Sequence, residues 1–203
     1  MIFLINNRMK NRYFFIRHGE SLRNKQKIAS CWPEKIKSPL IEKGVRQIKK
    51  AAKELKKKKI DFIFNSDLLR TKQTAGIIAK ELKIRPRIDK RLREVNVGIL
   101  NGKPIDEIGR FWDKEGKLSP QEYYKKRFKI APPKGENYYH IEKRLKSFLK
   151  DTEKRYKDKN ILVVSHQRLL TLLEKVVYHY SFKKLVKIII GKKEIKTGEI
   201  RKL

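Results

Sequence analysis

Two histidines and two arginines lie next to predicted strands and helices in a pattern that could hold a phosphate group. Arg17 and His18 directly follow the apolar run YFFI, and His166 comes two residues after the apolar run ILVV. Arg70 falls just inside the helix predicted after another strand. Phosphoryl transfer requires an in-line nucleophile, positive groups on the equatorial oxygens and a proton for the leaving oxygen. These residue types therefore predict chemistry on a phosphate ester.

Each of these four side chains can be given a role from its chemistry. His18 is the candidate nucleophile, because a neutral imidazole is competent near pH 7 and needs no metal ion. Its attack would form a phosphohistidine intermediate. Arg17 and Arg70 suit phosphate because a guanidinium donates two parallel hydrogen bonds and keeps its charge. His166 would complete the phosphate site and donate to the oxygens as charge spreads in the transition state.

Two further residues extend this candidate site. Glu94, at the start of a glycine-containing loop over residues 94–102, is the candidate general acid. It would protonate the leaving alcohol and then activate water. The alternative for Glu94 is an ordinary ion pair with the neighbouring Arg91 or Arg93. Asn24 would add a neutral hydrogen-bond donor for the phosphate.

The elements that must position these residues alternate between apolar runs and helical patterns. Buried strands are predicted at 13–16, 61–64, 84–88 and 161–164. Helices are predicted at 39–55, from the caps at 65–67 to about 82, at 140–156 and at 169–180. This alternation predicts an α/β fold, a three-layer α/β/α sandwich with a mainly parallel sheet. Such sheets bind ligands beyond the C-terminal ends of their strands, where the candidate residues fall.

The rest of the chain gives weaker patterns. Residues 105–139 are the least regular part, and we expect them to form a small helical lid. Within them, a capping box at 119–122 with proline at the first helical position predicts a short helix over 120–128. Residues 186–190 and 194–200 are predicted to be two further strands. We expect residues 1–203 to form a single domain, with residues 1–8 as an N-terminal extension.

The composition is strongly basic, since 203 residues with 54 Lys and Arg and 22 Asp and Glu carry a formal net charge of +32. This charge is spread along the chain without a nucleic-acid-binding motif, so a lysine-rich surface is favoured over a nucleic-acid partner. If the positive charge has a function, the simplest one is to attract a small phosphorylated substrate. No apolar run approaches the ~18 residues of a membrane-spanning helix, so we expect no membrane association and a cytoplasmic protein. The single Cys31 excludes an intramolecular disulfide and a multi-cysteine zinc site.

A series of short motifs runs through the chain in order. They are RHGES at 17–21 with Asn24, SPL at 38–40 with Gly44 and Gln47, SDLLRT at 66–71 with Thr74 and Ala75, LRE at 92–94 with Gly98 and Gly102, PKGE at 133–136 with Arg144, and VVSH at 163–166. Together they resemble the histidine phosphatase superfamily, also called phosphoglycerate-mutase-like, over residues 13–180. The resemblance implies its phosphatase branch, with no metal and no cofactor. It assigns catalysis and phosphate binding to Arg17, His18, Asn24, Arg70, Glu94 and His166.

The sequence departs from this family pattern after the last histidine. Gln167 and Arg168 stand where the family commonly has two glycines, although glutamine occurs in its bisphosphatase branch. Gln167 could narrow the pocket or contact the substrate. Arg168 could bind a second anionic group, or it could face solvent in the first turn of a helix. Ser38 and Asn137 also differ from the usual residues and bear on how the substrate fits.

We expect a phosphomonoesterase that hydrolyses a small phosphorylated metabolite. A phosphoglycerate-mutase-type transferase would use the same residues and return the phosphoryl group to the substrate. The compact chain favours hydrolysis, because mutases of this kind generally carry longer insertions around the pocket. The third alternative is a non-catalytic phosphate- or nucleic-acid-binding module. Neither the identity of the substrate nor the oligomeric state can be read from the sequence.

Overall fold

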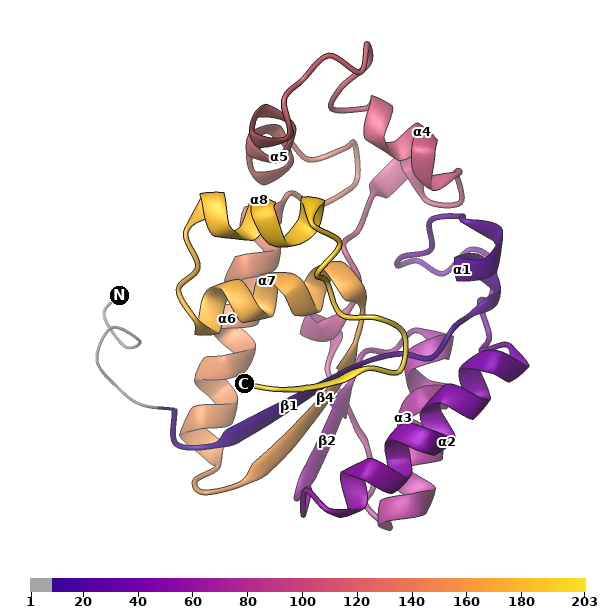
Figure 1. Ribbon diagram of the computed structural model, residues 1–203, viewed down its shortest axis with the longest axis vertical. Helices are drawn as coiled ribbons and strands as arrows, with labels where there is room; N and C mark the ends of the chain where they lie inside the picture. Colours follow the sequence, from indigo (N-terminus) through magenta and orange to yellow (C-terminus); the bar gives the residue numbers. More distant parts are fainter. Residues whose placement is uncertain (1–8) are drawn as a thin grey trace.

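The computed structural model describes residues 9–203, and a five-stranded sheet forms its centre (Figure 1). The strand order is β3 (Arg87–Ile88), β2 (Phe62–Asn65), β4 (Asn160–Ser165), β1 (Arg12–Arg17) and β5 (Ile200–Lys202). The first four strands are parallel, and β5 runs antiparallel to β1. The predicted extension over residues 1–8 lies outside the described residues.

Helices α2 (Glu42–Lys56) and α3 (Leu69–Leu82) cover one face of the sheet. Ile48 and Leu55 of α2 and Ile78 of α3 are fully buried there against Ile16 and Ile63. The helices form because their apolar residues recur at three- and four-residue intervals, which places them on one side of each helix. The helices predicted at 39–55 and from the caps at 65–67 to about 82 are thus confirmed, although α2 begins at Glu42 and α3 at Leu69. The predicted caps are wrong, because the N-cap of α3 is Leu68 and no side chain caps this helix.

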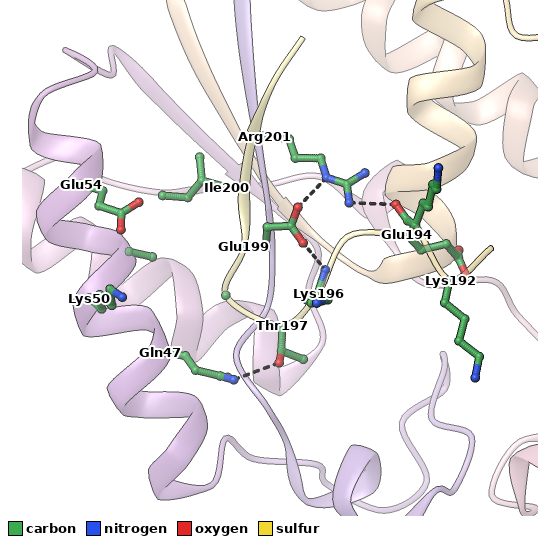
Figure 2. Close-up of a pocket in the computed structure, with 13 residues that line it drawn as sticks. Gln47, Lys50, Glu54, Lys192, Glu194, Lys196, Thr197, Glu199, Ile200 and Arg201 are labelled. Atoms are coloured by element: carbon green, nitrogen blue, oxygen red, sulfur yellow. Dashed lines mark hydrogen bonds and ion pairs between the residues drawn. The ribbon is translucent and has the colours of Figure 1, made fainter. Parts of the chain in front are cut away.

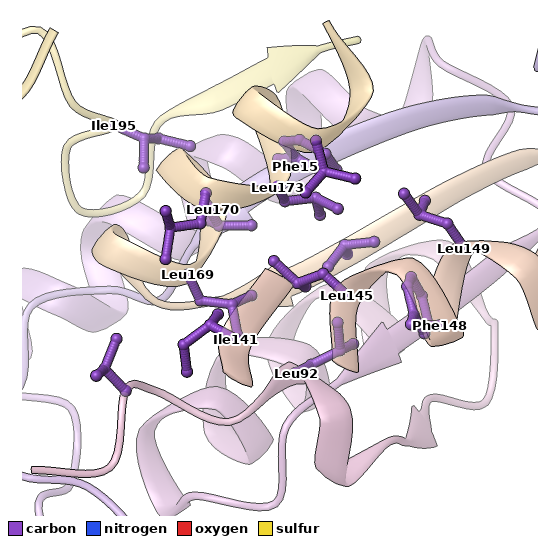
Figure 3. Packing of buried hydrophobic residues seen from close by; sticks show 14 of the residues in the cluster. Phe15, Leu92, Ile141, Leu145, Phe148, Leu149, Leu169, Leu170, Leu173 and Ile195 are labelled. Carbon is purple, nitrogen blue, oxygen red and sulfur yellow. The ribbon is translucent and has the colours of Figure 1, made fainter. Parts of the chain in front are cut away.

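Helices α6 (Tyr138–Arg155) and α7 (Gln167–Val177) cover the opposite face, as Figure 3 shows. Phe15 projects to this side and packs in one cluster with Leu145, Phe148 and Leu169. The central strands are buried on both faces, which explains why their sequences are continuous apolar runs. The three-layer α/β/α architecture with a mainly parallel sheet is therefore confirmed.

The register of the parallel strands decides where the candidate residues emerge. Arg17 of β1 pairs with Ser165 of β4, so His18 and His166 leave the sheet side by side. Asn65 of β2 pairs with Val164, which brings the start of α3 to the same edge. Residues separated by more than a hundred positions in the chain are thus neighbours at the C-terminal edge of the sheet.

Two short helices, α4 (Ile105–Arg110) and α5 (Pro120–Lys129), lie at the top of Figure 1, the end toward which β4 runs. The capping box that begins α5 is present, because the Glu122 backbone N–H donates to Ser119 Oγ at 3.3 Å and Glu122 Oε2 accepts from the Ser119 backbone N–H at 2.9 Å. The expected short helix is confirmed. The helix after it, α6, begins at Tyr138, so the candidate lid ends there.

Two predicted strands near the C-terminus are wrong. Residues 186–190 belong to a helix, α8 (Phe182–Ile190), whose first turn is capped by Ser181. Its isoleucine-rich sequence is typical of strands, but Leu185, Val186 and Ile189 lie on one side of the helix and are buried. Residues 194–199 are a loop, and β5 begins only at Ile200. Likewise, the strand predicted at 84–88 is reduced to Arg87–Ile88 after Pro86.

Candidate active site

Four side chains predicted to act together meet at the C-terminal edge of the sheet. His18 and His166 have ring centres 5.2 Å apart with planes at 63°, and Arg70 Nε lies 3.2 Å from His18 Nε2. Arg17 precedes His18 at the end of β1, and its charge lowers the pKa of both histidines. We call the group formed by Arg17, His18, Arg70 and His166 the phosphate cup.

The His18 ring is held in one orientation and one protonation state. Its Nδ1 lies 2.8 Å from the carbonyl oxygen of Gly19, an acceptor, which places the ring proton on Nδ1. The lone pair is then on Nε2, where it accepts the hydrogen bond from Arg70. Burial, followed by the charges of Arg70 and Arg17, lowers the pKa of His18 well below its usual 6.5. The His18 ring is therefore uncharged, and its lone pair is on Nε2, as the predicted nucleophile requires.

His166 is fully buried, and its two ring nitrogens differ in their surroundings. Nε2 lies 2.8 Å from Ser66 Oγ, which is in turn 2.7 Å from Thr71 Oγ1. Nδ1 is buried and has no hydrogen-bond partner. Burial, with Arg70 and then His18, lowers the pKa of His166. Because Nε2 is bonded to Ser66, Nδ1 is the ring nitrogen that remains without a partner beside His18.

Arg70 is held by a loop that the sequence reasoning missed. Its Nη2 donates to the backbone oxygen of Ser30 at 2.8 Å, and its Nη1 to Ser30 Oγ at 3.1 Å. The Glu34 carboxylate lies 3.4 Å from the same Nη1 and also accepts from the Leu69 backbone N–H. Ser30 and Glu34 lie in a short polar segment without periodicity, and no sequence signal singled them out. Their positions make them part of the wall of the cup.

Gly19 follows His18, and the structure gives a packing reason for a glycine at this position. A side chain there would place its Cβ 2.5 Å from the backbone oxygen of Gly44 in α2. The loop after β1 and the start of α2 thus touch through two glycines. The Gly19 backbone N–H donates to Thr74 Oγ1 at 3.2 Å, which fixes the loop that carries His18.

Glu94 lies close enough to the cup for its carboxylate to act on the guanidiniums. Burial lowers the pKa of both Arg17 and Arg70, and Glu94 is the strongest of the charges that oppose this effect. The loop before Glu94 is anchored by Ser165 Oγ, which donates to the Leu92 backbone oxygen at 2.7 Å. The structure thus places the predicted acid within electrostatic reach of the predicted phosphate ligands.

The other two predicted binding residues have a different setting. Asn24 Oδ1 accepts from both the backbone N–H and the hydroxyl of Ser21, at 3.1 and 2.9 Å, and caps the short helix α1 (Leu22–Gln26). Its amide nitrogen is left as a donor. Gln167 is half-buried at the first position of α7. Within residues 9–203 neither side chain hydrogen-bonds to the four side chains of the cup, so substrate binding by Asn24 and Gln167 stays a prediction.

The side chains of the cup are buried, and a surface hollow lies elsewhere. His18 is only 2% exposed. A cavity of about 700 Å³ lies instead between α2 and the segment 192–201, as Figure 2 shows. There Gln47 donates to Thr197, and Glu199 accepts from both Lys196 and Arg201. This cavity contains none of the residues expected to do chemistry, so the site is assigned by the side chains of the cup.

Residues 9–203 contain neither a candidate metal site nor a helix that could span a membrane. No group of three or more His, Cys, Asp or Glu side chains in that range is arranged to hold a metal ion. In the same range, every helix is too short or too polar to cross a membrane.

Comparison with known proteins agrees with this geometry. A family model described as histidine phosphatase superfamily, branch 1, matches residues 13–200. The chain belongs to the histidine phosphatase superfamily. A probable phosphoglycerate mutase GpmB of Yersinia pestis (strain Pestoides F) is 40% identical over 95 residues. That match covers 47% of this chain and 43% of the relative, so the chain spans less than half of the curated relative that it matches.

Solved structures of this superfamily superpose over most of the chain. The mycobacterial glucosyl-3-phosphoglycerate phosphatase gives a TM-score of 0.79 at 21% identity and covers 95% of this chain and 92% of its own. A putative alpha-ribazole-5'-P phosphatase from Escherichia coli gives 0.76 at 23% identity, covering 97% and 90%. YhfR of Bacillus stearothermophilus gives 0.72 at 27% identity, covering 86% and 83%. The first two likenesses establish the shared fold, and the superfamily contains both phosphatases and phosphoglycerate mutases.

Proposed function

We propose that this protein is a metal-independent phosphomonoesterase that acts through a phosphohistidine on His18. The observation that carries the proposal is the state of the His18 ring. Its Nδ1 faces a carbonyl oxygen, and its Nε2 faces Arg70, beside the free Nδ1 of His166. The membership of a superfamily of phosphatases and mutases supports the same reading.

In the first step, the lone pair of His18 Nε2 attacks the phosphorus atom as the bond from phosphorus to the ester oxygen breaks. The guanidiniums of Arg17 and Arg70 carry the negative charge of the equatorial oxygens. His166 Nδ1 would donate to the same oxygens, because its other nitrogen is held by Ser66. Glu94, in its acid form, gives its proton to the leaving alcohol.

In the second step, water attacks the phosphorus atom on the opposite side from His18. The Glu94 carboxylate takes a proton from that water, which restores its acid form. The bond between His18 Nε2 and phosphorus breaks, and inorganic phosphate leaves. The buried, unprotonated state of His18 keeps Nε2 available for the next cycle.

The substrate that we propose is a small phosphorylated metabolite. The cup would take a terminal phosphoryl group, and the helices α4 and α5 beyond it would cover the remainder of the substrate. A phosphoglycerate-mutase activity is the second candidate, favoured by the 40% identity to a probable phosphoglycerate mutase over 95 residues. Hydrolysis releases inorganic phosphate, whereas a mutase interconverts phosphate isomers.

The test is a panel of phosphomonoesters with the purified protein, measured as release of inorganic phosphate in the presence of a chelator. His18→Ala should lower kcat/KM by about a thousandfold or more, because the covalent nucleophile is lost. Arg46→Gln, which removes an exposed charge on α2, is the matched control and should stay within about twofold. Full activity of His18→Ala, or loss of wild-type activity with the chelator, would refute the proposal. Isomer interconversion without phosphate release would favour the mutase.

A further inference from the structure

Buried polar atoms without a hydrogen-bond partner gather around and beyond the cup. Within residues 9–203, two of them, Arg17 Nε and His166 Nδ1, belong to the cup itself. Three others, Arg168 Nη1, Tyr138 Oη and Arg127 Nε, belong to residues outside the proposed catalytic set. Folded proteins leave few such atoms unsatisfied, because each costs about 1–3 kcal/mol. A cluster of them beside a phosphate site indicates groups arranged for a bound molecule.

Arg168 connects the two sets of atoms. It lies in the first turn of α7, two residues after His166, and its Nη1 is 3.0 Å from Glu194 Oε1. This contact lacks the direction of a hydrogen bond, so Nη1 has an opposite charge nearby but no acceptor. The side chain is 22% exposed, which leaves part of it accessible to a ligand. Its guanidinium carbon lies 5.7 Å from the ring centre of Tyr124 in α5.

Arg168 is also electrostatically coupled to the cup. Burial is the main cause of the lowered pKa of Arg17, and the charge of Arg168 lowers it further. Burial alone would lower the pKa of Arg168, but its neighbours, among them Tyr138 and Glu194, raise it overall, so the side chain stays charged. The same two carboxylates, Glu94 and Glu194, raise the pKa of both arginines, so Arg17 and Arg168 share their charged neighbours. A substrate with two anionic groups would find one guanidinium for each of them.

The side of Arg168 toward the lid is built from aromatic residues. Tyr138 is 1% exposed, and its hydroxyl has no partner. Burial raises the pKa of Tyr138, while Arg127 and then Arg168 lower it, so both guanidiniums lie near that hydroxyl. The guanidinium carbon of Arg127 is 4.9 Å from the Tyr138 ring centre. The Tyr138 hydroxyl and the Arg168 guanidinium thus lie near one another, and each has a buried atom without a hydrogen-bond partner.

A structural ion pair would not explain these observations. The carboxylate of Glu194 already accepts a hydrogen bond from Thr171 Oγ1 at 2.9 Å, so it is anchored without Arg168. Burying a guanidinium beside it brings little net stability, because the cost of removing both charges from water offsets their attraction. The side chain of Arg168 is also much larger than the glycine common at this position in the family.

We propose that Arg168, with the Tyr138 hydroxyl, binds a second anionic group of the substrate. The substrate class is then a small phosphomonoester that carries a carboxylate or a second phosphate a few bonds from the phosphoryl group that enters the cup. Arg168 is a specificity-determining residue in this inference, which rests on the phosphomonoesterase function proposed above.

The test compares substrates that differ only in the second anion. One pair is 3-phosphoglycerate and glycerol 1-phosphate, in which a hydroxymethyl group replaces the carboxylate. The other pair is fructose 1,6-bisphosphate and fructose 6-phosphate, which tests a second phosphate. The wild type should prefer the doubly anionic member of at least one pair by about tenfold or more in kcat/KM. Arg168→Gln should lose that preference, because its kcat/KM should fall at least about fivefold further on the doubly anionic member than on the singly anionic member.

A second variant separates ligand binding from folding. Glu194→Gln keeps the acceptor for Thr171 and removes the charge that competes for Arg168. If Arg168 serves an anion of the substrate, Glu194→Gln should strengthen the preference that Arg168→Gln abolishes. If the pair is only structural, both variants should lower the melting temperature and affect both members of a substrate pair equally. That second pattern would overturn the inference.

The two proposals fail in different ways. Loss of all turnover in the wild type on both pairs would refute the phosphomonoesterase function. Calorimetric binding of the same four compounds would still decide the role of Arg168, through the affinity difference between wild type and Arg168→Gln. Normal turnover with no preference for a second anion would refute only the role of Arg168.

Discussion

The phosphate cup and the lid region over residues 105–137 are built on different principles. In the cup, His18, Arg70 and His166 are at most 3% exposed, and each is bonded to a neighbouring polar group. In the lid, aromatic and basic side chains stack on one another, with Arg127 4.2 Å from the ring centre of Trp112. Phe111 and Ile130 there remain exposed. Strand register thus fixes the positions of the cup residues, whereas the lid would select the rest of the substrate in the function that we propose.

The lid packs on other parts of the fold. Phe128 of α5 packs against Phe182 of α8 with ring centres 5.6 Å apart, and Trp112 lies in one cluster with Cys31 and Val97. Gly98, within the loop over residues 94–102 that begins with Glu94, lies against the turn at Pro133 that leads into α6. Changes in the lid should therefore alter substrate fit without disturbing the cup, and the predictions below test this separation.

The largest contrast is expected between two arginines. Arg70→Gln removes the guanidinium that contacts His18 and carries phosphate charge, and kcat/KM should fall by about 10²–10³. Arg110→Gln removes an exposed charge from α4 and should change kcat/KM by less than about twofold. Steady-state phosphate release measures both. Equal losses in the two variants would show that the lid belongs to the catalytic machinery.

A pair of glycines tests the joint between the regions. Gly98 has φ +56°, and a Cβ there would lie 2.0 Å from the Pro133 backbone oxygen. Gly98→Ala should cost about 3 kcal/mol in the free energy of unfolding, from the unfavourable conformation together with this clash. Gly116, with φ +71° and no atom near its Cβ position, should cost about 1 kcal/mol as Gly116→Ala. Urea denaturation measures both free energies of unfolding. Equal losses in the two variants would mean that the close contact at Gly98 does not contribute to stability.

Acid should weaken the cup in particular. His18 and His166 have pKa values well below 6.5 in the folded protein, mainly through burial, so the unfolded chain binds more protons as the pH falls below 6.5. The free energy of unfolding should then decrease with falling pH by up to about 2.7 kcal/mol per unit, from about 1.36 for each histidine. Urea denaturation between pH 7 and 5.5 measures this slope. His18→Gln should halve it, and an unchanged slope in that variant would contradict the buried neutral state.

The smallest contrast concerns kcat against KM. Ser66→Ala removes the hydroxyl that orients His166, and kcat should fall by about tenfold with KM within about twofold. Tyr124→Leu removes a lid aromatic near Arg168, and KM should rise severalfold with kcat nearly unchanged. The opposite result, in which Ser66→Ala changes KM and Tyr124→Leu changes kcat, would contradict the division of roles between the cup and the lid.

What could be predicted from the sequence follows the same division. The apolar runs before His18 and His166 identify buried parallel strands, and parallel strands bring their C-terminal ends together, so the meeting of these two residues was predictable. Glu94 could be placed only near the site, because its position depends on the anchoring of Leu92 by Ser165.

The parts that could not be predicted depend on tertiary contacts. Ser30 and Glu34 lie in a loop whose only signal is its contact with Arg70. The isoleucine-rich segment of α8 has the residue types of a strand, and its packing against α5 makes it a helix. Arg168 stood out in the sequence as a departure from the family pattern, but only the unsatisfied atoms around it indicate a use.

The most direct test of the account is to trap the phosphorylated enzyme. Glu94→Gln incubated with p-nitrophenyl phosphate should accumulate the intermediate, because nitrophenolate leaves without an acid whereas water attack lacks its base. After an alkaline quench, mass spectrometry should find one phosphoryl group per chain on His18, and none after His18→Ala. Release of nitrophenolate with no phosphorylated enzyme, or a phosphoryl group on His166 in place of His18, would contradict the account.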